Sequence, residues 1–246
     1  MQKPILIVHP KDNTTRFLDR VKNHLVKTNP DIIHHFNIQY SDSSHQECLE
    51  RIDNHNKDGL VLFFGHGRSN SLYGSKAPFY DQFVSNDAVQ EQPEKYYGKE
   101  VFIAEENLSV FNNKKVFCLA CNSNSKLAQQ AIDAGAITFL GFGDIPSSIH
   151  ELKEQGENSI ESSLSRMVKE LKTEYNYIIK RSLSLSILNS HSFEQLYDLI
   201  RFITNQRIAN ILVDKTYLKE RRRIADHLYR FKSEMKIYGD KSAPVL

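Results

Sequence analysis

The sequence has few cysteines, few glycines and prolines, and no long hydrophobic run. Three cysteines (Cys48, Cys118 and Cys121) in 246 residues are too few and odd in number for a disulfide framework, and they favour a reducing compartment. With 10 Gly, 7 Pro and 40% hydrophobic residues, the composition argues against extensive disorder. The length suffices for one large domain, or for one domain with a helical extension.

Neither a membrane segment nor a secretion signal is predicted. The N-terminal apolar run at 5–8 is too short for the core of a signal peptide, and polar residues follow it directly. No other run approaches the length that a membrane-spanning helix needs. We therefore expect a cytoplasmic protein that does not engage a membrane.

Charge is distributed unevenly along the chain. The net charge is +2, but residues 181–246 hold 12 Lys or Arg against 7 Asp or Glu. The densest basic run, at 219–223, is better explained as a solvated helix face than as a contact with phosphates. Nucleic acid is therefore not an expected partner, whereas a regulatory role and a partner-binding role for the basic tail both stay open.

Strand and helix patterns alternate from residue 4 to residue 144, which predicts an α/β fold with an open, mostly parallel sheet. Apolar or extended runs predict strands at 4–8, 32–38, 59–64, 115–120 and 137–140. Apolar residues at helical spacing predict helices at 13–27, 44–55 and 125–134. The run at 59–64 is typical of a central strand covered on both faces. Gly135 is the expected stop of the helix before it.

Two regions depart from this alternation. Residues 68–100 contain several turn-forming residues and predict an irregular excursion with a hairpin. Everything after about residue 150 has helical spacing, over 157–180, 192–210 and 214–235. We therefore assign an α/β core to residues 1–148 and a helical C-terminal region, packed on that core or extending from it, to residues 149–246.

Two predicted strands end in residues suited to nucleophilic catalysis. His66, within Gly65-His66-Gly67, follows one strand and Cys121 ends another. Because chemically active side chains of parallel sheets gather past the C-terminal strand ends, these two can meet in space. A cysteine peptidase needs a thiolate, an imidazole and donors for the oxyanion. We interpret Cys121 as nucleophile, His66 as general base, and the backbone amides of Gly67 and Cys121 as the oxyanion hole.

Cys118 and Cys121 also form a C-x-x-C pair, which raises thiol redox chemistry or half of a zinc site. Redox pairs lie at a helix start rather than across a strand, and no second Cys pair completes a zinc site. Cys118 lies inside the predicted strand and is expected to pack, as is Cys48 on the apolar face of its helix. No metal or cofactor is expected.

Several segments carry a family pattern in order, at 62–67, 102–108, 116–123, 127–128, 134–136 and 139–141. Together they resemble the CHAT branch of caspase-fold peptidases over roughly residues 59–144. The resemblance implies a caspase-like three-layer α/β sandwich, a dyad of His66 and Cys121, and hydrolysis of protein or peptide substrates without a metal or organic cofactor. It also implies a regulated protease in prokaryotic defence or cell death, with an activating partner or a small-molecule signal. The chain departs from these relatives at two places. At 122–124, after the Cys, relatives carry an acidic residue and Thr-Gly, and at 143–144, after the next strand, they carry a Trp.

Asp144 follows the strand next to the one that ends in Cys121. We interpret it as a specificity residue that selects a basic side chain before the scissile bond, since bidentate recognition of Arg by a carboxylate is strong. A role in capping the loop before Pro146 explains it as well. Two alternatives remain for the whole chain: an inactive caspase-fold module that binds a protein partner or a nucleotide signal, and a flavodoxin-like or other doubly wound ligand-binding domain.

Overall fold

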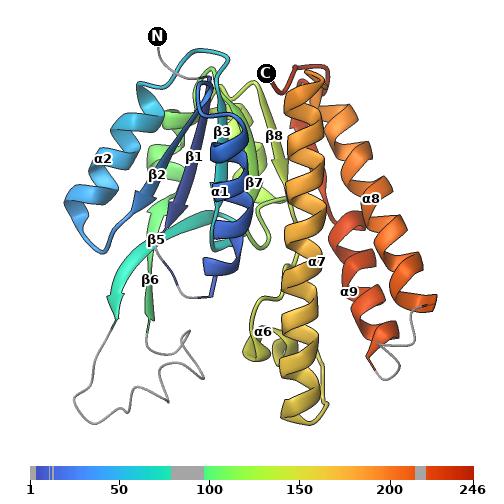
Figure 1. Cartoon of the computed structure of the whole chain (residues 1–246). Coiled ribbons are helices and arrows are strands. Elements are labelled where there is room, and N and C mark those ends of the chain that lie inside the picture. The colour runs from blue at the N-terminus through green and yellow to red at the C-terminus, as the bar shows by residue number, and fades with distance from the viewer. Residues whose placement is uncertain (1–3, 11, 13, 79–96, 214–219) are drawn as a thin grey trace.

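The computed structural model describes residues 4–10, 12, 14–78, 97–213 and 220–246. A six-stranded sheet forms its centre, with strand order β2-β1-β3-β7-β8-β9 (Figure 1). Neighbouring strands run parallel from β2 to β8, and β9 runs antiparallel to β8. The strands are β1 (Ile5–Pro10), β2 (Ile33–Ile38), β3 (Leu60–Phe64), β7 (Lys115–Leu119), β8 (Thr138–Gly141) and β9 (Lys236–Gly239).

The four strands β1, β3, β7 and β8 are buried along their whole length. This is the environment expected for parallel strands whose two faces are both covered, and it explains their continuous apolar sequences. The predicted open, mostly parallel sheet is confirmed. The strand at 59–64 lies inside the sheet as predicted, with β1 on one side and β7 on the other.

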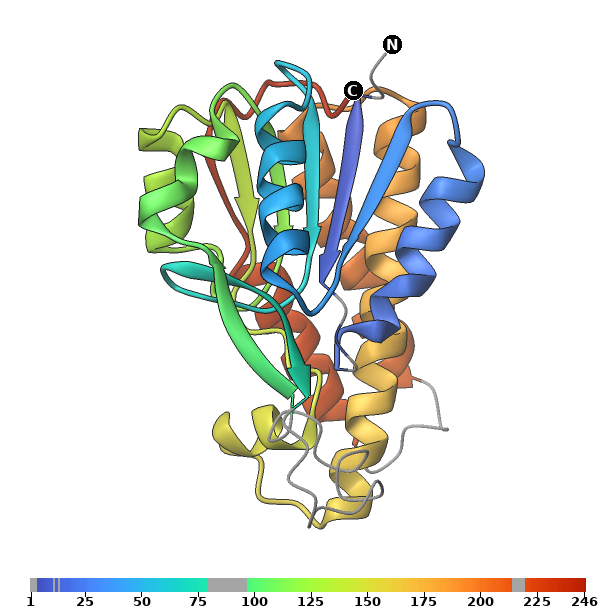
Figure 2. The same cartoon turned by 90° about the vertical axis from the view of Figure 1, so that its left-hand side faces the viewer.

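Helices cover both faces of the sheet, as Figure 2 shows from the side of α2. Successive residues of each strand face opposite layers, so Ile5 and Ile7 join one apolar cluster while Leu6 and Val8 join the other. One face packs against α2 (Asp42–Asp53), the 3-10 helix η2 (Glu105–Phe111) and α5 (Lys126–Asp133). The other packs against η1 (Arg16–Leu18), α1 (Asp19–Thr28), α6 (Ile149–Glu154), α7 (Glu161–Leu188), α8 (Phe193–Val213) and α9 (Arg221–Ser233).

Local sequence signals explain how several helices begin and end. Ser41 precedes α2, and its side chain accepts a hydrogen bond from the backbone N–H of Ser44. Gly135, after α5, has φ +99°, the left-handed conformation that glycine adopts most easily, so the predicted helix stop is confirmed. Cys48 and Cys118 are fully buried, which confirms that both pack in the core.

Stacked aromatic rings join the C-terminal helices to the sheet. Phe117 of β7 packs against Phe142 with ring centroids 5.3 Å apart, and Phe142 stacks on Phe231 of α9 at 5.2 Å. Tyr175 of α7 lies 5.0 Å from Phe231. The predicted boundary between residues 148 and 149 falls at the start of α6, and the apolar cluster on this face continues across it. None of the described helices is long and apolar enough to cross a membrane.

One strand differs from the sequence predictions and a small second sheet agrees with them. The edge strand β9 differs from the expectation that everything after about residue 150 is helical: it pairs with β8, with Tyr238 opposite Phe139. An antiparallel sheet of β4 (Gly67–Arg68), β5 (Ser71–Pro78) and β6 (Tyr97–Ile103) confirms the predicted hairpin for the described part of 68–100. Residues 79–96 of that excursion lie outside the described residues.

Candidate active site

The ends of β3 and β7 place His66 and Cys121 at the same edge of the sheet. Phe64, the last residue of β3, pairs with Leu119, the last residue of β7. The pairing continues one step further, because the N–H of Gly65 donates to the carbonyl oxygen of Leu119 at 3.2 Å. His66 and Cys121 each follow two residues after these strand ends, so the sheet brings together the two residues that the sequence predicts as a dyad.

His66 and Cys121 line one small cavity. Its volume is about 20 Å³, which is room for roughly one water molecule. His66 is 8% exposed and Cys121 is half-buried, so the cysteine is the more exposed residue of the two. The remaining wall is formed by apolar residues, by Gly65 and by three hydroxyl-bearing residues, Thr15, Ser147 and Tyr175.

The Cys121 sulfur lies against the loop that follows β8. The backbone N–H of Ile145 donates to Sγ at 3.4 Å, and the thiol donates to the carbonyl oxygen of Ile145 at 3.5 Å. The first bond favours the thiolate and the second favours the thiol. Together they hold the sulfur in position without selecting its charge state.

A buried serine fixes the turn that carries Cys121. Ser123 is fully buried, its Oγ donates to the carbonyl oxygen of Cys118 at 2.9 Å, and it accepts from the N–H of Phe142 at 3.0 Å. Asn122 has φ +56°, and its N–H donates to the carbonyl oxygen of Gly143 at 3.0 Å. The turn after β7 is thus tied to the loop after β8, and both hold the sulfur in place.

Asp12, in the loop between β1 and η1, is a functional candidate that the sequence predictions missed. Its Oδ1 lies 3.3 Å from Nε2 of His66, and the two side chains are 11% and 10% exposed. Oδ1 also accepts from the backbone N–H groups of Thr14 at 2.7 Å and Thr15 at 3.2 Å, and from the Thr14 hydroxyl. The sequence carries the same signal for Asp12 as for His66 and Cys121, namely a polar residue shortly after a buried strand.

The Asp12 carboxylate remains charged despite its burial. Burial alone would raise the pKa of Asp12, but the hydrogen bond with His66, the charge of His66 and the hydrogen bonds from Thr14 together hold that pKa well below its usual range. The Thr14 hydroxyl also lies within hydrogen-bonding distance of Nε2 of His66. A negative charge is therefore fixed beside one nitrogen of the imidazole.

Gly67 lies directly against the turn that carries Cys121. A Cβ atom at this position would be 3.0 Å from the carbonyl oxygen of Cys121 and 3.0 Å from Cβ of Ala120. Only a residue without a side chain permits this approach without displacing a neighbour. The two backbones that are expected to form the oxyanion hole are thus adjacent, and the role of their amides stays a prediction.

Asp144 directly precedes Ile145, whose backbone contacts Cys121, but its own polar groups form hydrogen bonds with other residues. Its carboxylate accepts a hydrogen bond from the side-chain amide of Asn122 at 2.8 Å, and its N–H donates to Oε2 of Glu234 at 3.1 Å. In the described part of the chain, its side chain does not line the cavity of His66 and Cys121. The proposed selection of a basic substrate residue stays a prediction.

The other two cysteines have environments that suit packing. Burial raises the pKa of both Cys48 and Cys118 well above the usual range of a thiol. The described residues contain no cluster of three His, Cys, Asp or Glu side chains that could hold a metal ion. Cys121 is the one of the three whose side chain is neither deeply buried nor part of a strand.

Comparisons of the chain with protein-family models, with curated proteins and with solved structures found no match. The function is therefore inferred from the arrangement of the chain's own residues. That arrangement consists of two adjacent strand ends, a cavity shared by His66 and Cys121, and a buried carboxylate beside the imidazole.

Proposed function

We propose that this protein is a cysteine endopeptidase of the caspase-like CHAT type, with Cys121 as nucleophile and His66 as general base. The observation that carries the proposal is the small cavity that both side chains line at the ends of β3 and β7. A mostly parallel sheet between helical layers is also the architecture that the family resemblance implies. An inactive binding module would need neither a partly exposed cysteine nor an imidazole with a carboxylate partner.

The proposed reaction uses the two nitrogens of His66 for different tasks. Nε2 faces Asp12 and Thr14, which leaves Nδ1 to accept the proton of the Cys121 thiol. The thiolate attacks the scissile carbonyl carbon, and the C–N bond breaks as His66 returns the proton to the leaving amine. Water then hydrolyses the thioester, releases the acid product and restores the thiol.

Asp12 has a positioning role in this scheme. Its charge stabilises the imidazolium that forms when His66 takes the proton, and its hydrogen bond fixes the orientation of the ring. The loop around Asp12 is itself held by the N–H groups of Thr14 and Thr15. The carboxylate therefore does not need to reorganise during the reaction, which is the condition for efficient electrostatic stabilisation.

The developing oxyanion needs donors near Cys121. The amides of Gly67 and Cys121 are the proposed pair, supported by the close approach of their two segments. Asp144 remains a proposed determinant for a basic residue before the scissile bond. In biological terms we propose a regulated cytoplasmic protease that acts on protein or peptide substrates in prokaryotic defence or cell death, under the control of a partner or a small-molecule signal.

The test compares wild type, Cys121→Ala and Cys118→Ala on fluorogenic peptides with Arg, Lys, Asp or Leu before the scissile bond. Cleavage should disappear in Cys121→Ala and persist in Cys118→Ala, which removes a sulfur three positions away that is fully buried. Cleavage that survives in Cys121→Ala would refute the assigned nucleophile. If no peptide is cut, the rate of Cys121 alkylation in wild type and in His66→Ala tests the dyad independently of substrate choice.

A further inference from the structure

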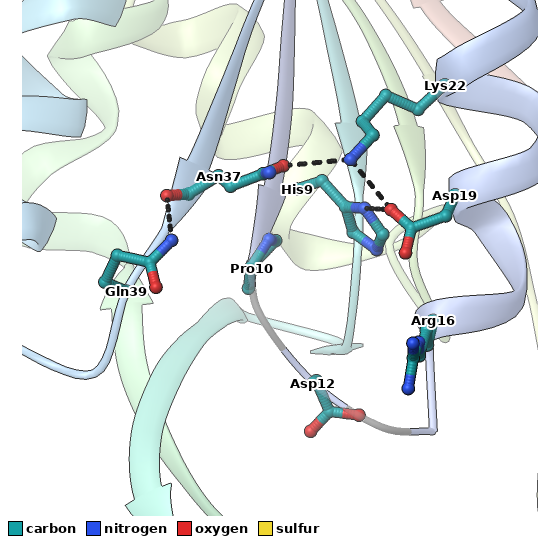
Figure 3. Close-up of a pocket in the computed structure, with 8 residues that line it drawn as sticks. All are labelled: His9, Pro10, Asp12, Arg16, Asp19, Lys22, Asn37 and Gln39. Atoms are coloured by element: carbon teal, nitrogen blue, oxygen red, sulfur yellow. Dashed lines mark hydrogen bonds and ion pairs between the residues drawn. The ribbon is translucent and has the colours of Figure 1, made fainter.

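A second and larger cavity lies at the C-terminal ends of β1 and β2, with Asp12 and residues of η1 and α1 in its wall (Figure 3). Its volume is about 410 Å³, within the range of pockets that bind small molecules. The strand order reverses at β1, and the crevice that such a reversal opens lies between β1 and β3, on the side of His66. The larger cavity has a residue of β2, Asn37, in its wall and lies next to that crevice.

His9, on the wall of this cavity, has an unused hydrogen-bonding atom. The residue is 4% exposed, and its Nδ1 lies 3.4 Å from Oδ1 of Asp19. Its Nε2 is buried and has no hydrogen-bond partner among the described residues. When Nδ1–H donates to the Asp19 carboxylate, Nε2 of the neutral ring is an acceptor that requires a donor. Nε2 itself has almost no accessible surface, so a ligand in the cavity supplies this donor only when the imidazole turns toward it.

Lys22 lies beside His9 and also has capacity for a ligand. Its ammonium donates to Asp19 at 2.8 Å and to the side-chain oxygen of Asn37 at 3.2 Å, as Figure 3 shows. An ammonium carries three donors, so one remains for a further acceptor. A ligand hydroxyl can accept from Lys22, and a hydroxyl can also donate to His9 once that ring turns toward the cavity.

The two carboxylates and two cations that line the cavity sum to zero charge, and Arg16 is an exposed cation among them. The two carboxylates that line the cavity are engaged, Asp19 with Lys22 and His9, and Asp12 with Thr14 and His66. Arg16 is exposed and makes no ion pair within the described part of the chain. A guanidinium without a partner at the mouth of a polar cavity is suited to bidentate binding of a phosphate.

We propose that this cavity binds a ribose phosphate, either as a free sugar phosphate or as part of a nucleotide. The sugar hydroxyls meet His9 and Lys22 on the inner wall, and the phosphate meets Arg16 at the opening. The assignment does not depend on peptidase activity. Asp12 lines this cavity and contacts His66, so an occupant lies next to the loop that holds the imidazole.

The test is calorimetric titration of the full chain with ribose 5-phosphate and with AMP, and with ribose and inorganic phosphate as partial probes. Ribose 5-phosphate should bind at least about tenfold more tightly than either partial probe, because both subsites contribute. Tighter binding of AMP would assign the site to a nucleotide, and equal or weaker binding would assign it to the free sugar phosphate. The same titration with Cys121→Ala should be unchanged, which separates this proposal from the proposed peptidase.

Two variants examine the predicted contacts. Arg16→Gln and Lys22→Met should each weaken binding of ribose 5-phosphate by at least about tenfold, since each removes a charged donor. Arg20→Gln, at an exposed position of the same segment, should leave affinity within about twofold. Circular dichroism checks the fold of Lys22→Met, and the exposed Arg16 variant decides the outcome if that fold is lost. The proposal would be overturned if neither ribose 5-phosphate nor AMP binds at roughly 10 mM, or if Arg16→Gln leaves the affinity for ribose 5-phosphate unchanged.

Discussion

Replacing Asp12 with asparagine removes one negative charge beside His66 and changes the size of the side chain very little. Oδ1 of Asp12 accepts hydrogen bonds from the backbone of Thr14 and Thr15, and the amide oxygen of asparagine can accept the same bonds. The loop should therefore keep its conformation. What disappears is the charged partner 3.3 Å from Nε2 of His66.

The magnitude of the expected loss follows from the burial of this pair. The side chains of Asp12 and His66 are 11% and 10% exposed, so solvent screens their interaction weakly. A hydrogen bond to a charged group in such a setting contributes about 1.5–3 kcal/mol. If this stabilisation is realised when His66 becomes an imidazolium, kcat/KM for peptide cleavage should fall by roughly 10- to 150-fold in Asp12→Asn. The rate of Cys121 alkylation should also be lower in Asp12→Asn than in wild type.

Asp240→Asn is a matched control for this experiment. Oδ1 of Asp240 accepts hydrogen bonds from the N–H and hydroxyl of Ser242, two residues later, as Asp12 does from Thr14. The N–H of Asp240 donates to the carbonyl oxygen of Ile137, which places it at the opposite end of the sheet. Cleavage by Asp240→Asn should stay within about twofold of wild type. Wild-type rates in Asp12→Asn, or equal losses in both variants, would refute the role assigned to Asp12.

Three further predictions concern the cysteines, the oxyanion segment and acid stability. Iodoacetamide should modify Cys121 in the native protein and spare Cys48 and Cys118, because both are fully buried and burial raises the pKa of their thiols. Mass spectrometry of the labelled protein checks this, and comparable labelling of Cys118 would contradict it. Gly67→Ala should lower the free energy of unfolding, measured in urea, by about 1–3 kcal/mol and should reduce peptide cleavage, because the new Cβ lies 3.0 Å from the Cys121 carbonyl oxygen. An unchanged free energy of unfolding and an unchanged cleavage rate would show that the neighbouring backbone moves aside easily. Since folding lowers the pKa of Asp12, its carboxylate stabilises the fold above the unfolded pKa of about 3.9 and loses this effect as pH falls. Urea unfolding should therefore show a steeper loss of stability between about pH 5 and pH 3 for wild type than for Asp12→Asn, and equal slopes would contradict the assigned shift.

The sequence predicts the central sheet well because its strands are buried on both faces. A strand such as β3, which is buried at every position, requires an uninterrupted apolar run that is visible without any structure. The edge strand β9 carries no such signal, since it has four residues and none of them is fully buried. Its place beside β8 depends on contacts between residues that are distant in sequence, such as Tyr238 with Phe139.

The same reasoning explains which site residues the sequence could reveal. His66 and Cys121 follow apolar strands directly, and parallel strands end at one edge, so the sequence predicts that both lie at that edge. Their proximity depends on the pairing of β3 with β7. Asp12 lies in a polar loop with several possible partners. Its contact with His66 requires that β1 lie beside β3, which the paired residues from Ile5 with Leu60 to Val8 with Phe63 establish.

The position of β1 also relates the two cavities to each other. Because β1 lies between β2 and β3, the loop that follows it faces the larger cavity on one side and His66 on the other. A ligand can change the reactivity of Cys121 through this loop only if it binds one arrangement of Asp12 more tightly than another. The coupling is then reciprocal, so occupation of the small cavity must change the affinity of the larger one by the same factor. Asp12 offers one route for such regulation, because it lines one cavity and contacts the imidazole of the other. The 3-10 helix η1 offers a second route, since Arg16 lines the larger cavity while Phe17 and Leu18 line the smaller one.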